Sequence, residues 1–270
     1  MAEAAEIVLV RAPNPGPLTG SGTNTWIYGR EETVVIDPGP ADESHLERVA
    51  ESAQRQGRVV AVAVTHHHRD HLDGAARLCE LTGAPLAVHF RRADQAADLP
   101  MHDGDRLLVG DSQLEAIHTP GHASDHLCFF DRSVRVLFTG DHVLQGTTSL
   151  VMPPDGDMAA YLTSLDRVLE LRPRRLHPGH GESIEDAEGA IRHLISHRLQ
   201  REAQILDHLR LGPTSPEELV PQLYASYPKE VLGMASGTVL AHLLKLERQG
   251  RVRRLGVAEQ ARFELVGEPS

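Results

Sequence analysis

The chain has 270 residues, enough for one large domain and a small second one, and its two cysteines, Cys79 and Cys128, stand in apolar contexts that predict reduced core thiols. It carries 27 Lys and Arg against 38 Asp and Glu, a formal net charge of −11, which argues against broad electrostatic adhesion to nucleic acid because phosphate binding normally requires a positive surface. Since neither a signal segment nor an apolar run of membrane-spanning length is visible, we expect a cytoplasmic protein without membrane association.

Short apolar runs broken by turn-forming residues continue through most of the chain. This pattern predicts strands in series, interrupted by helices, and the two apolar runs on either side of residues 30–32 predict a hairpin. Gly83 stands where the second helix should end in the left-handed conformation. We expect strands at residues 6–10, 26–29, 33–37, 59–64, 86–90, 106–109, 113–118, 127–131, 134–139 and 175–177, and helices at residues 41–54, 73–81 and 157–170.

The residues that follow the expected strand 59–64 are rich in metal ligands. Imidazole and carboxylate groups suit zinc, and a loop at the end of a rigid strand can direct them inward. Further candidates downstream each follow a short apolar run and stand among Gly or Pro, which lets the backbone turn closely around a metal. This repetition favours a built metal site over an incidental histidine-rich surface tract. The candidates are His66, His68, Asp70 and His71, then His122, Asp141 and His180.

In this order and spacing, His-x-His-x-Asp-His followed by His, Asp and His, the series resembles the metallo-β-lactamase-fold hydrolases. The resemblance covers residues 5–185 and includes the leading strand at residues 34–39. Residues 22–25, 140–148 and 195–198 resemble the β-lactamase-like protein 2 branch, whose animal members are mitochondrial single-strand endoribonucleases. Related branches hydrolyse thioesters, so the resemblance leaves the substrate open.

The resemblance implies a fold of the α/β (α+β) class, an αββα sandwich of two mixed β-sheets with outer helices. It also implies two zinc ions per chain, with Mn²⁺ or Fe²⁺ as alternatives, and a hydroxide between the two ions as the nucleophile. Asp70 and Asp141 are then the catalytic residues, because Asp70 can relay the proton of the nucleophile and Asp141 bridges the ions. In the family pattern, His66, His68 and His122 bind one ion, and Asp70, His71 and His180 bind the other.

Further polar residues near the ligands divide into two groups. His126, Thr147 and Thr148 are expected to line the mouth of the site and contact the substrate. His67 lies between ligands and should point the opposite way, which predicts a structural role. His142, next to the bridging carboxylate, is expected to support that carboxylate rather than bind metal.

The last part of the chain predicts helices followed by a two-stranded ribbon. A helical pattern runs from Asp186 to Arg210, and Ser215 opens a capping box with proline at the first helical position. Another helix is expected at about residues 236–249, and ribbon strands at residues 251–255 and 261–266, an order that resembles a winged helix. The expected domains are residues 1–185 (catalytic), 186–211 (linking helix) and 212–270 (winged helix).

Cations gather where the third of these helices meets the ribbon. They are candidate substrate contacts, because a basic helix end and wing can hold RNA phosphates. Alternatively, they form a solvated helix end that complements the helix dipole, and no aromatic residue is interleaved to stack bases. The domain could also pack on a neighbour, as a homodimer or as a lid over the site. The cations are Lys245, Arg248, Arg251, Arg253 and Arg254.

Three functions from different classes follow. The first is a dizinc phosphodiesterase or endoribonuclease acting on single-stranded RNA, favoured by the resemblance and the basic wing. The second is a thioesterase or another hydrolase of a small anionic ester or lactone, of the glyoxalase II type, favoured by the acidic net charge. The third, a non-catalytic nucleic-acid-binding protein, is disfavoured by the complete ligand set. Antibiotic hydrolysis is also disfavoured, because Asp141 stands where those enzymes usually carry cysteine.

Overall fold

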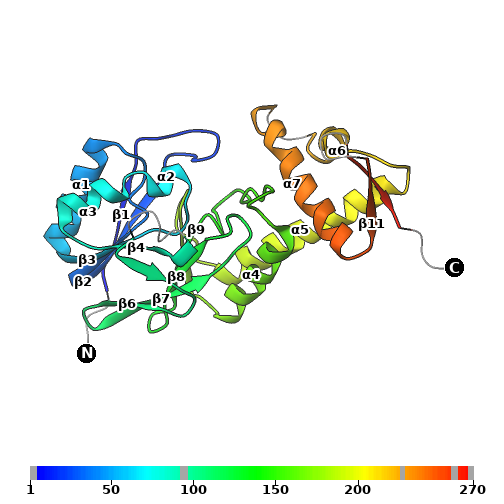
Figure 1. Ribbon diagram of the computed structural model, residues 1–270. Helices are drawn as coiled ribbons and strands as arrows, with labels where there is room; N and C mark the ends of the chain where they lie inside the picture. Colours follow the sequence, from blue (N-terminus) through cyan, green and yellow to red (C-terminus); the bar gives the residue numbers. More distant parts are fainter. Residues whose placement is uncertain (1–4, 92–96, 226–228, 257–260, 267–270) are drawn as a thin grey trace.

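Two five-stranded β-sheets form the body of the molecule (Figure 1). The computed structural model describes residues 5–91, 97–225, 229–256 and 261–266. In the first sheet, of order β1-β2-β3-β4-β5, β1 is antiparallel to β2 and the other neighbours are parallel. In the second, of order β10-β9-β8-β7-β6, only β10 and β9 are parallel. The strands are β1 (Ile7–Arg11), β2 (Asn24–Ile36), β3 (Gly57–Ala63), β4 (Leu86–His89), β5 (Leu99–Met101), β6 (Arg106–Val109), β7 (Ser112–His118), β8 (Leu127–Asp131), β9 (Val136–Gly140) and β10 (Arg175–Pro178).

The side-chain alternation of β2 explains why its apolar run is nearly continuous. Trp26 and Tyr28 point between the sheets, where both rings contact Phe138 of the second sheet. Ile27 and Val35 point to the opposite face and pack under helices. Because successive residues of a strand face opposite sides, a sheet covered on both faces needs apolar residues at every position.

Helices cover the outer face of each sheet and complete the expected sandwich (Figure 1). Asp42 caps the first of them by accepting a hydrogen bond from the backbone N–H of His45, and Asp157 caps the fourth in the same way. Gly83 ends the third in the left-handed conformation, with φ 70°, as expected. The αββα arrangement is therefore confirmed. The helices are α1 (Glu43–Gln56) and α3 (Ala75–Thr82) on the first sheet, and α4 (Met158–Glu170) and α5 (Ala187–Leu209) on the second.

The expected hairpin at residues 26–37 is wrong. One strand, β2, runs through this stretch and bends near Gly29 and Glu31, whose φ angles are 121° and 62°. Residues 24–28 pair with β1 and residues 31–36 pair with β3, so the chain continues along one sheet instead of reversing. Local turn signals do not reveal this, because the partner of each half lies elsewhere in the sequence. The pattern also missed β5 and the short helix α2 (Arg69–Leu72).

The winged helix is built on the second half of α5. Ile205 and Leu209 of that helix pack with Leu219, Leu243 and Phe263 in a separate apolar cluster. The first half of α5 packs instead on the second sheet, so one continuous helix contributes to both cores (Figure 1). The expected capping box at the start of α6 is present. The remaining elements are α6 (Pro216–Leu223), α7 (Lys229–Arg248), and the antiparallel pair β11 (Val252–Leu255) and β12 (Arg262–Leu265).

Across the described residues, none of the helices combines the length and the apolar character needed to cross a membrane.

Candidate metal centre

The candidate ligands meet because parallel strands end at a common edge. β3 ends at Ala63, and the chain then turns through Thr65 and His66 into α2. β9 and β10 are parallel in the second sheet and deliver Asp141 and His180 just beyond their ends. The backbone N–H of residue 127 donates to the Thr65 carbonyl at 2.7 Å, which joins the two sheets at this edge. Residues distant in sequence therefore share one site.

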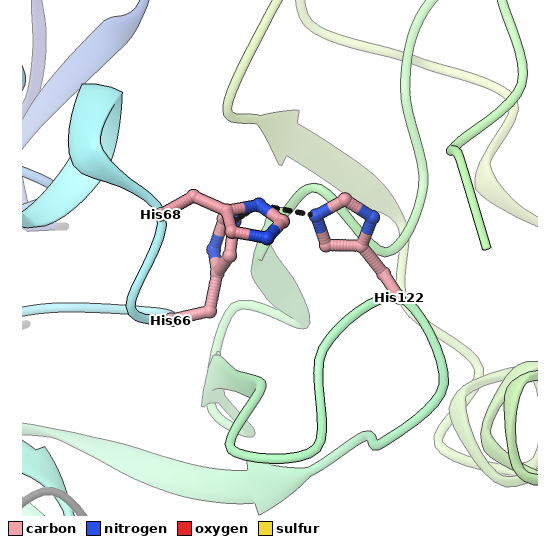
Figure 2. Close-up of side chains that lie close together, drawn as sticks. All are labelled: His66, His68 and His122. Carbon is pink, nitrogen blue, oxygen red and sulfur yellow. Dashed lines mark hydrogen bonds between the residues drawn. The ribbon is translucent and has the colours of Figure 1, made fainter. Parts of the chain in front are cut away.

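The first set of candidate ligands consists of three imidazoles. Figure 2 shows the rings of His66, His68 and His122 pointing toward one another from two different loops. His68 Nδ1 lies 3.0 Å from His66 Nε2 and 2.9 Å from His122 Nε2. Nitrogen ligands of one tetrahedral zinc ion stand about 3.4 Å apart, from bond lengths of about 2.0–2.1 Å. The spacing of these nitrogens fits a single metal ion.

The second set lies beside the first and shares a carboxylate with it. His180 Nε2 is 3.3 Å from both His71 Nε2 and Asp70 Oδ2. Asp141 Oδ1 lies 3.4 Å from His71 and 3.3 Å from His180, while its Oδ2 lies 3.8 Å from His122 Nε2 of the first set. Asp141 is therefore placed between the two sets.

Asp141 also provides a test of whether metal fits. Its Oδ1 is buried and makes no well-aligned hydrogen bond within the described residues. A buried carboxylate oxygen without such a partner is costly, and a cation between the two ligand sets would satisfy it. The donor set, imidazole nitrogen and carboxylate oxygen, is the kind that binds zinc or iron. The residues present fit a pair of metal ions.

Several ligands are held by hydrogen bonds from their remote ring nitrogens. His71 Nδ1 donates to Asp37 Oδ2 at 2.9 Å, and Asp37 also accepts from the backbone N–H of Thr65 at 2.7 Å. His122 Nδ1 donates to the Leu150 carbonyl at 2.6 Å. These bonds fix the tautomer and leave Nε2 free to face the centre.

Sequence reasoning did not identify Asp37 or Leu150 as part of the site. The sequence did contain a signal that Asp37 belongs to the site. Asp37 is a carboxylate directly after the apolar end of β2, at the same sheet edge as the candidate ligands. Leu150 contributes only its carbonyl, and no side-chain pattern can reveal such a role. Arg198 of α5, fully buried, donates to the carbonyl of the neighbouring Ser149 and so ties this loop to the long helix.

The imidazoles of the site fall into two groups, one with lowered and one with raised pKa values. Burial, together with neighbouring imidazoles, holds the pKa of His66 well below its usual value, so this ring is neutral. Burial also disfavours the charged form of His180, but the carboxylates of Asp141 and Asp70 outweigh it and raise its pKa to about 9. The pKa of His71 is raised against its burial by Asp37 and Asp141. Without metal, protons on His71 and His180 compensate the buried negative charge.

Of the residues expected to contact substrate, His126 lies under the centre rather than at its mouth. It is fully buried, stacks on His66 with ring centroids 5.1 Å apart, and accepts a hydrogen bond from the backbone N–H of Asp141 at 3.2 Å. Thr147 is exposed and Thr148 half-buried on the loop that follows β9. His126 can therefore hold Asp141 in place, and the two threonines remain candidates for substrate contact.

The two histidines given structural roles belong to neither of the two ligand sets. His67 Nδ1 donates to the buried Asp125 at 2.8 Å, away from the centre. His142 is buried against the ring of Tyr161, with centroids 5.1 Å apart.

The five cations of the winged helix each lie near a carboxylate. Lys245 is buried and its ammonium lies 2.5 Å from Glu202, inside the domain core rather than on a surface that a substrate can reach. Arg248 reaches the catalytic body and pairs with Asp157. The remaining pairs are Arg251 with Glu202 at 3.5 Å, Arg253 with Glu264, and Arg254 with Glu247 at 2.7 Å.

Replacement of Asp37 by Asn should weaken metal binding by about 10- to 100-fold, the usual cost of losing the hydrogen-bond partner of a ligating imidazole. The substitution keeps the side-chain shape but removes the carboxylate from His71 Nδ1. Competition with a chromogenic chelator measures the affinity. Asp73→Asn is the matched control, because Asp73 makes only an exposed ion pair with Arg69 among the described contacts. Equal affinity in Asp37→Asn and wild type would contradict the assigned role.

Metal binding should release protons. A ligating imidazole must be neutral, whereas His180, with its pKa of about 9, and His71 are protonated at neutral pH in the metal-free protein. Affinity for Zn²⁺ should therefore rise from neutral pH through about pH 9, where His180 loses its proton. Calorimetric titration at neutral pH, in buffers of different ionisation enthalpy, counts the protons released. Affinity that does not change between neutral pH and pH 9, with no proton release, would contradict this electrostatic picture.

Comparison with known proteins agrees with the geometry. Residues 18–180 match the model of the metallo-beta-lactamase superfamily, and residues 215–260 match that of the beta-lactamase associated winged helix domain. The chain is 29% identical to a beta-lactamase-like protein 2 homolog of Drosophila melanogaster, over 92% of this chain and 90% of that protein. It is 30% identical to an atrochrysone carboxyl ACP thioesterase of Aspergillus chevalieri, over 92% of this chain and 85% of the relative.

Solved structures share the fold, and one of these relatives was solved with a bound metal pair. A metallo-beta-lactamase family protein of Thermus thermophilus superposes with a TM-score of 0.79 at 24% identity, covering 96% of this chain and 98% of that one. A protein solved in a di-iron-bound form matches at 29% identity with a TM-score of 0.54, over 68% of this chain and 96% of that one. With its His and Asp cluster at the shared sheet edge, the chain belongs to the metallo-beta-lactamase superfamily and is a metallo-hydrolase.

Proposed function

We propose that this metallo-hydrolase is a dinuclear zinc phosphodiesterase that cleaves single-stranded RNA. The observation that carries the proposal is the position of Asp141 between two separate ligand sets. Two zinc ions held in this way would polarise a phosphoryl oxygen, lower the pKa of a bound water and stabilise the leaving group. The sets are His66, His68 and His122 on one side, and Asp70, His71 and His180 on the other.

Side chains around the metal ions would supply the proton acceptor and set the direction from which the substrate approaches. Asp70 has 31% of its side chain exposed, so it stands at the open side of the cluster. Burial opposes its ionisation, but the hydrogen bond from His180, together with the charges of His71 and His180, outweighs burial and holds the Asp70 pKa below its usual value. An ionised carboxylate at the solvent side can accept a proton from the attacking water. His66 and His71 are buried behind it, so the substrate approaches from the Asp70 side.

Two features favour RNA as the substrate. The resemblance to the β-lactamase-like protein 2 branch, drawn from the residues around the motif, points to single-strand endoribonucleases. The winged helix is a module that often binds nucleic acid, and here α7 reaches the catalytic body through the ion pair of Arg248 with Asp157, at 2.6 Å.

A thioesterase acting on a small anionic acyl substrate is the second candidate. The wing cations are matched by carboxylates, and the formal net charge is −11, so the positive surface that phosphate binding needs is reduced. The similarity to an acyl carrier protein thioesterase supports the same candidate. Two metal ions would polarise a thioester carbonyl as readily as a phosphoryl group.

A side-by-side assay should separate the candidates. We expect the zinc-loaded protein to cleave labelled single-stranded RNA, and chelation followed by zinc replacement to abolish and restore the cleavage. Asp141→Asn should lower metal content and remove turnover, because the shared charge is lost. Hydrolysis of an acyl thioester with no cleavage of RNA would instead establish the second candidate. Turnover that survives complete metal removal would refute both.

The contribution of the wing to RNA binding can be measured from the dependence of the KM on salt concentration. If it holds RNA phosphates, replacing Arg251, Arg253 and Arg254 by Ala should raise the KM for RNA and reduce the dependence of binding on salt, since fewer counterions are released. The salt slope of the KM is measured for wild type and variant, and the difference between the two slopes reports how many phosphates these side chains neutralise.

A control variant removes the same charge elsewhere. Arg48, Arg55 and Arg77 lie on α1 and α3, and their replacement by Ala should leave the KM and the salt slope at wild-type values. If both triple variants behave like wild type, the wing does not hold RNA.

A further inference from the structure

A column of four aromatic rings leads away from the metal centre. His118 and His89 stack with centroids 4.6 Å apart and 28° between their planes. His89 contacts Phe90 at 4.6 Å, and Phe90 stacks on His102 at 4.4 Å with only 15° between the planes. The metal-binding motif does not include any of these rings.

The inner end of the column belongs to the same sheet edge as the ligands. His118 Nε2 donates to the Ser124 carbonyl at 3.0 Å, on the loop between His122 and His126. His89 shares a small cavity with the ligand His66.

The strand register places Phe90 at that edge as well. In the parallel pair of β3 and β4, Ala63 is opposite Ala87, so Phe90 stands as far beyond Ala87 as His66 stands beyond Ala63. Phe90 and His66 thus both follow the ends of neighbouring strands, so the column begins next to the first candidate ligand.

The outer half of the column, Phe90 and His102, is open to solvent. Phe90 is 41% exposed and belongs to none of the apolar clusters of the described core. The guanidinium of Arg91 lies 5.9 Å from the centroid of the Phe90 ring, and both Arg91 and His102 are exposed. Burial, with His118 nearby, lowers the pKa of His89 to about 4, so the inner ring is neutral and stacks as an aromatic group.

We propose that Phe90 and His102, with Arg91 beside them, form a platform on which a base of single-stranded RNA stacks while the adjoining phosphodiester reaches the metal centre. Any nucleobase offers a flat face to an aromatic ring, so such a platform holds RNA without selecting sequence. Arg91 adds a planar cation that can pair with a neighbouring phosphate or stack on a base. A flexible acyl chain would be matched better by an aliphatic groove than by exposed rings beside a cation. The assignment rests on the proposed RNA substrate.

The test measures binding without cleavage. The zinc-loaded protein is titrated into a fluorescently labelled single-stranded oligomer of 2′-O-methyl nucleotides, and into an oligomer of equal length and charge whose central bases are absent. Fluorescence anisotropy should show that wild type binds the complete oligomer about tenfold more tightly, within the range for one base on an aromatic ring. Phe90→Ala should lose most of this preference, and Phe90→Trp should keep it.

A surface variant on a neighbouring hairpin controls for loss of an exposed apolar residue. Leu108 is 70% exposed on β6, opposite Gln113, and Gln113 lies about 17 Å from His118 along β7 by the usual strand rise. Leu108→Ala should bind like wild type. The metal content of every variant is measured, so that a damaged centre is distinguished from a lost platform.

Two results of the binding assay would overturn the platform. One is equal binding of the two oligomers by wild type, and the other is a preference that persists in Phe90→Ala. If Phe90→Ala instead changes only the KM for a thioester with an aromatic acyl group, the rings bind that acyl group and not a base. Failure of the zinc-loaded wild type to cleave RNA would refute the proposed function by itself, because base preference is read here from binding alone.

Discussion

The buried carboxylate of Asp141 is the charge around which the centre is arranged. An ionised carboxylate away from water is stable only beside positive charge. In the metal-free protein that charge comes from protons on His71 and His180, and burial, which alone would raise the pKa of Asp141, is overcome by these two imidazoles. Metal ions would replace the protons at the same place. Positive charge therefore faces Asp141 in both forms, as protons on the two imidazoles or as metal ions in their place.

The framework around this charge is a meeting of two sheets. Asp37, His66 and His71 come from the edge of the first sheet, and Asp141 and His180 from the edge of the second. Hydrogen bonds fasten the edges together, among them that of Asn24 Nδ2 to the Pro178 carbonyl at 3.0 Å. A slip of one strand by a single residue would turn its ligand to the other face, so strand register is a condition for metal binding.

The winged helix illustrates how charge in the sequence differs from charge on the surface. Lys245 belongs to a cationic run in the sequence, yet its ammonium is buried against Glu202 in the folded domain. Removing one partner of such a pair typically costs about 3–5 kcal/mol, because the other charge is left buried and unpaired. Its presence is thus explained by packing, without a nucleic-acid partner. The aromatic column next to the centre shows the reverse case, in which residues from three separate segments form one column of rings that runs from the buried His89 to the exposed Phe90 and His102.

The amino-acid sequence by itself indicated the candidate ligand series from His66 to His180 and the winged helix, because ligand spacing, apolar periodicity and capping residues are local properties. The sandwich class followed from the resemblance of that series to a known family and not from periodicity. Only the tertiary structure decided which neighbours β2 has, and hence that residues 26–37 form one bent strand instead of a hairpin. It also decided that Asp37 supports His71, that His126 lies beneath Asp141, and that Phe90 stacks on His102. Each of these depends on contacts between segments far apart along the chain, and such contacts are set by strand register and sheet packing, which no local pattern encodes.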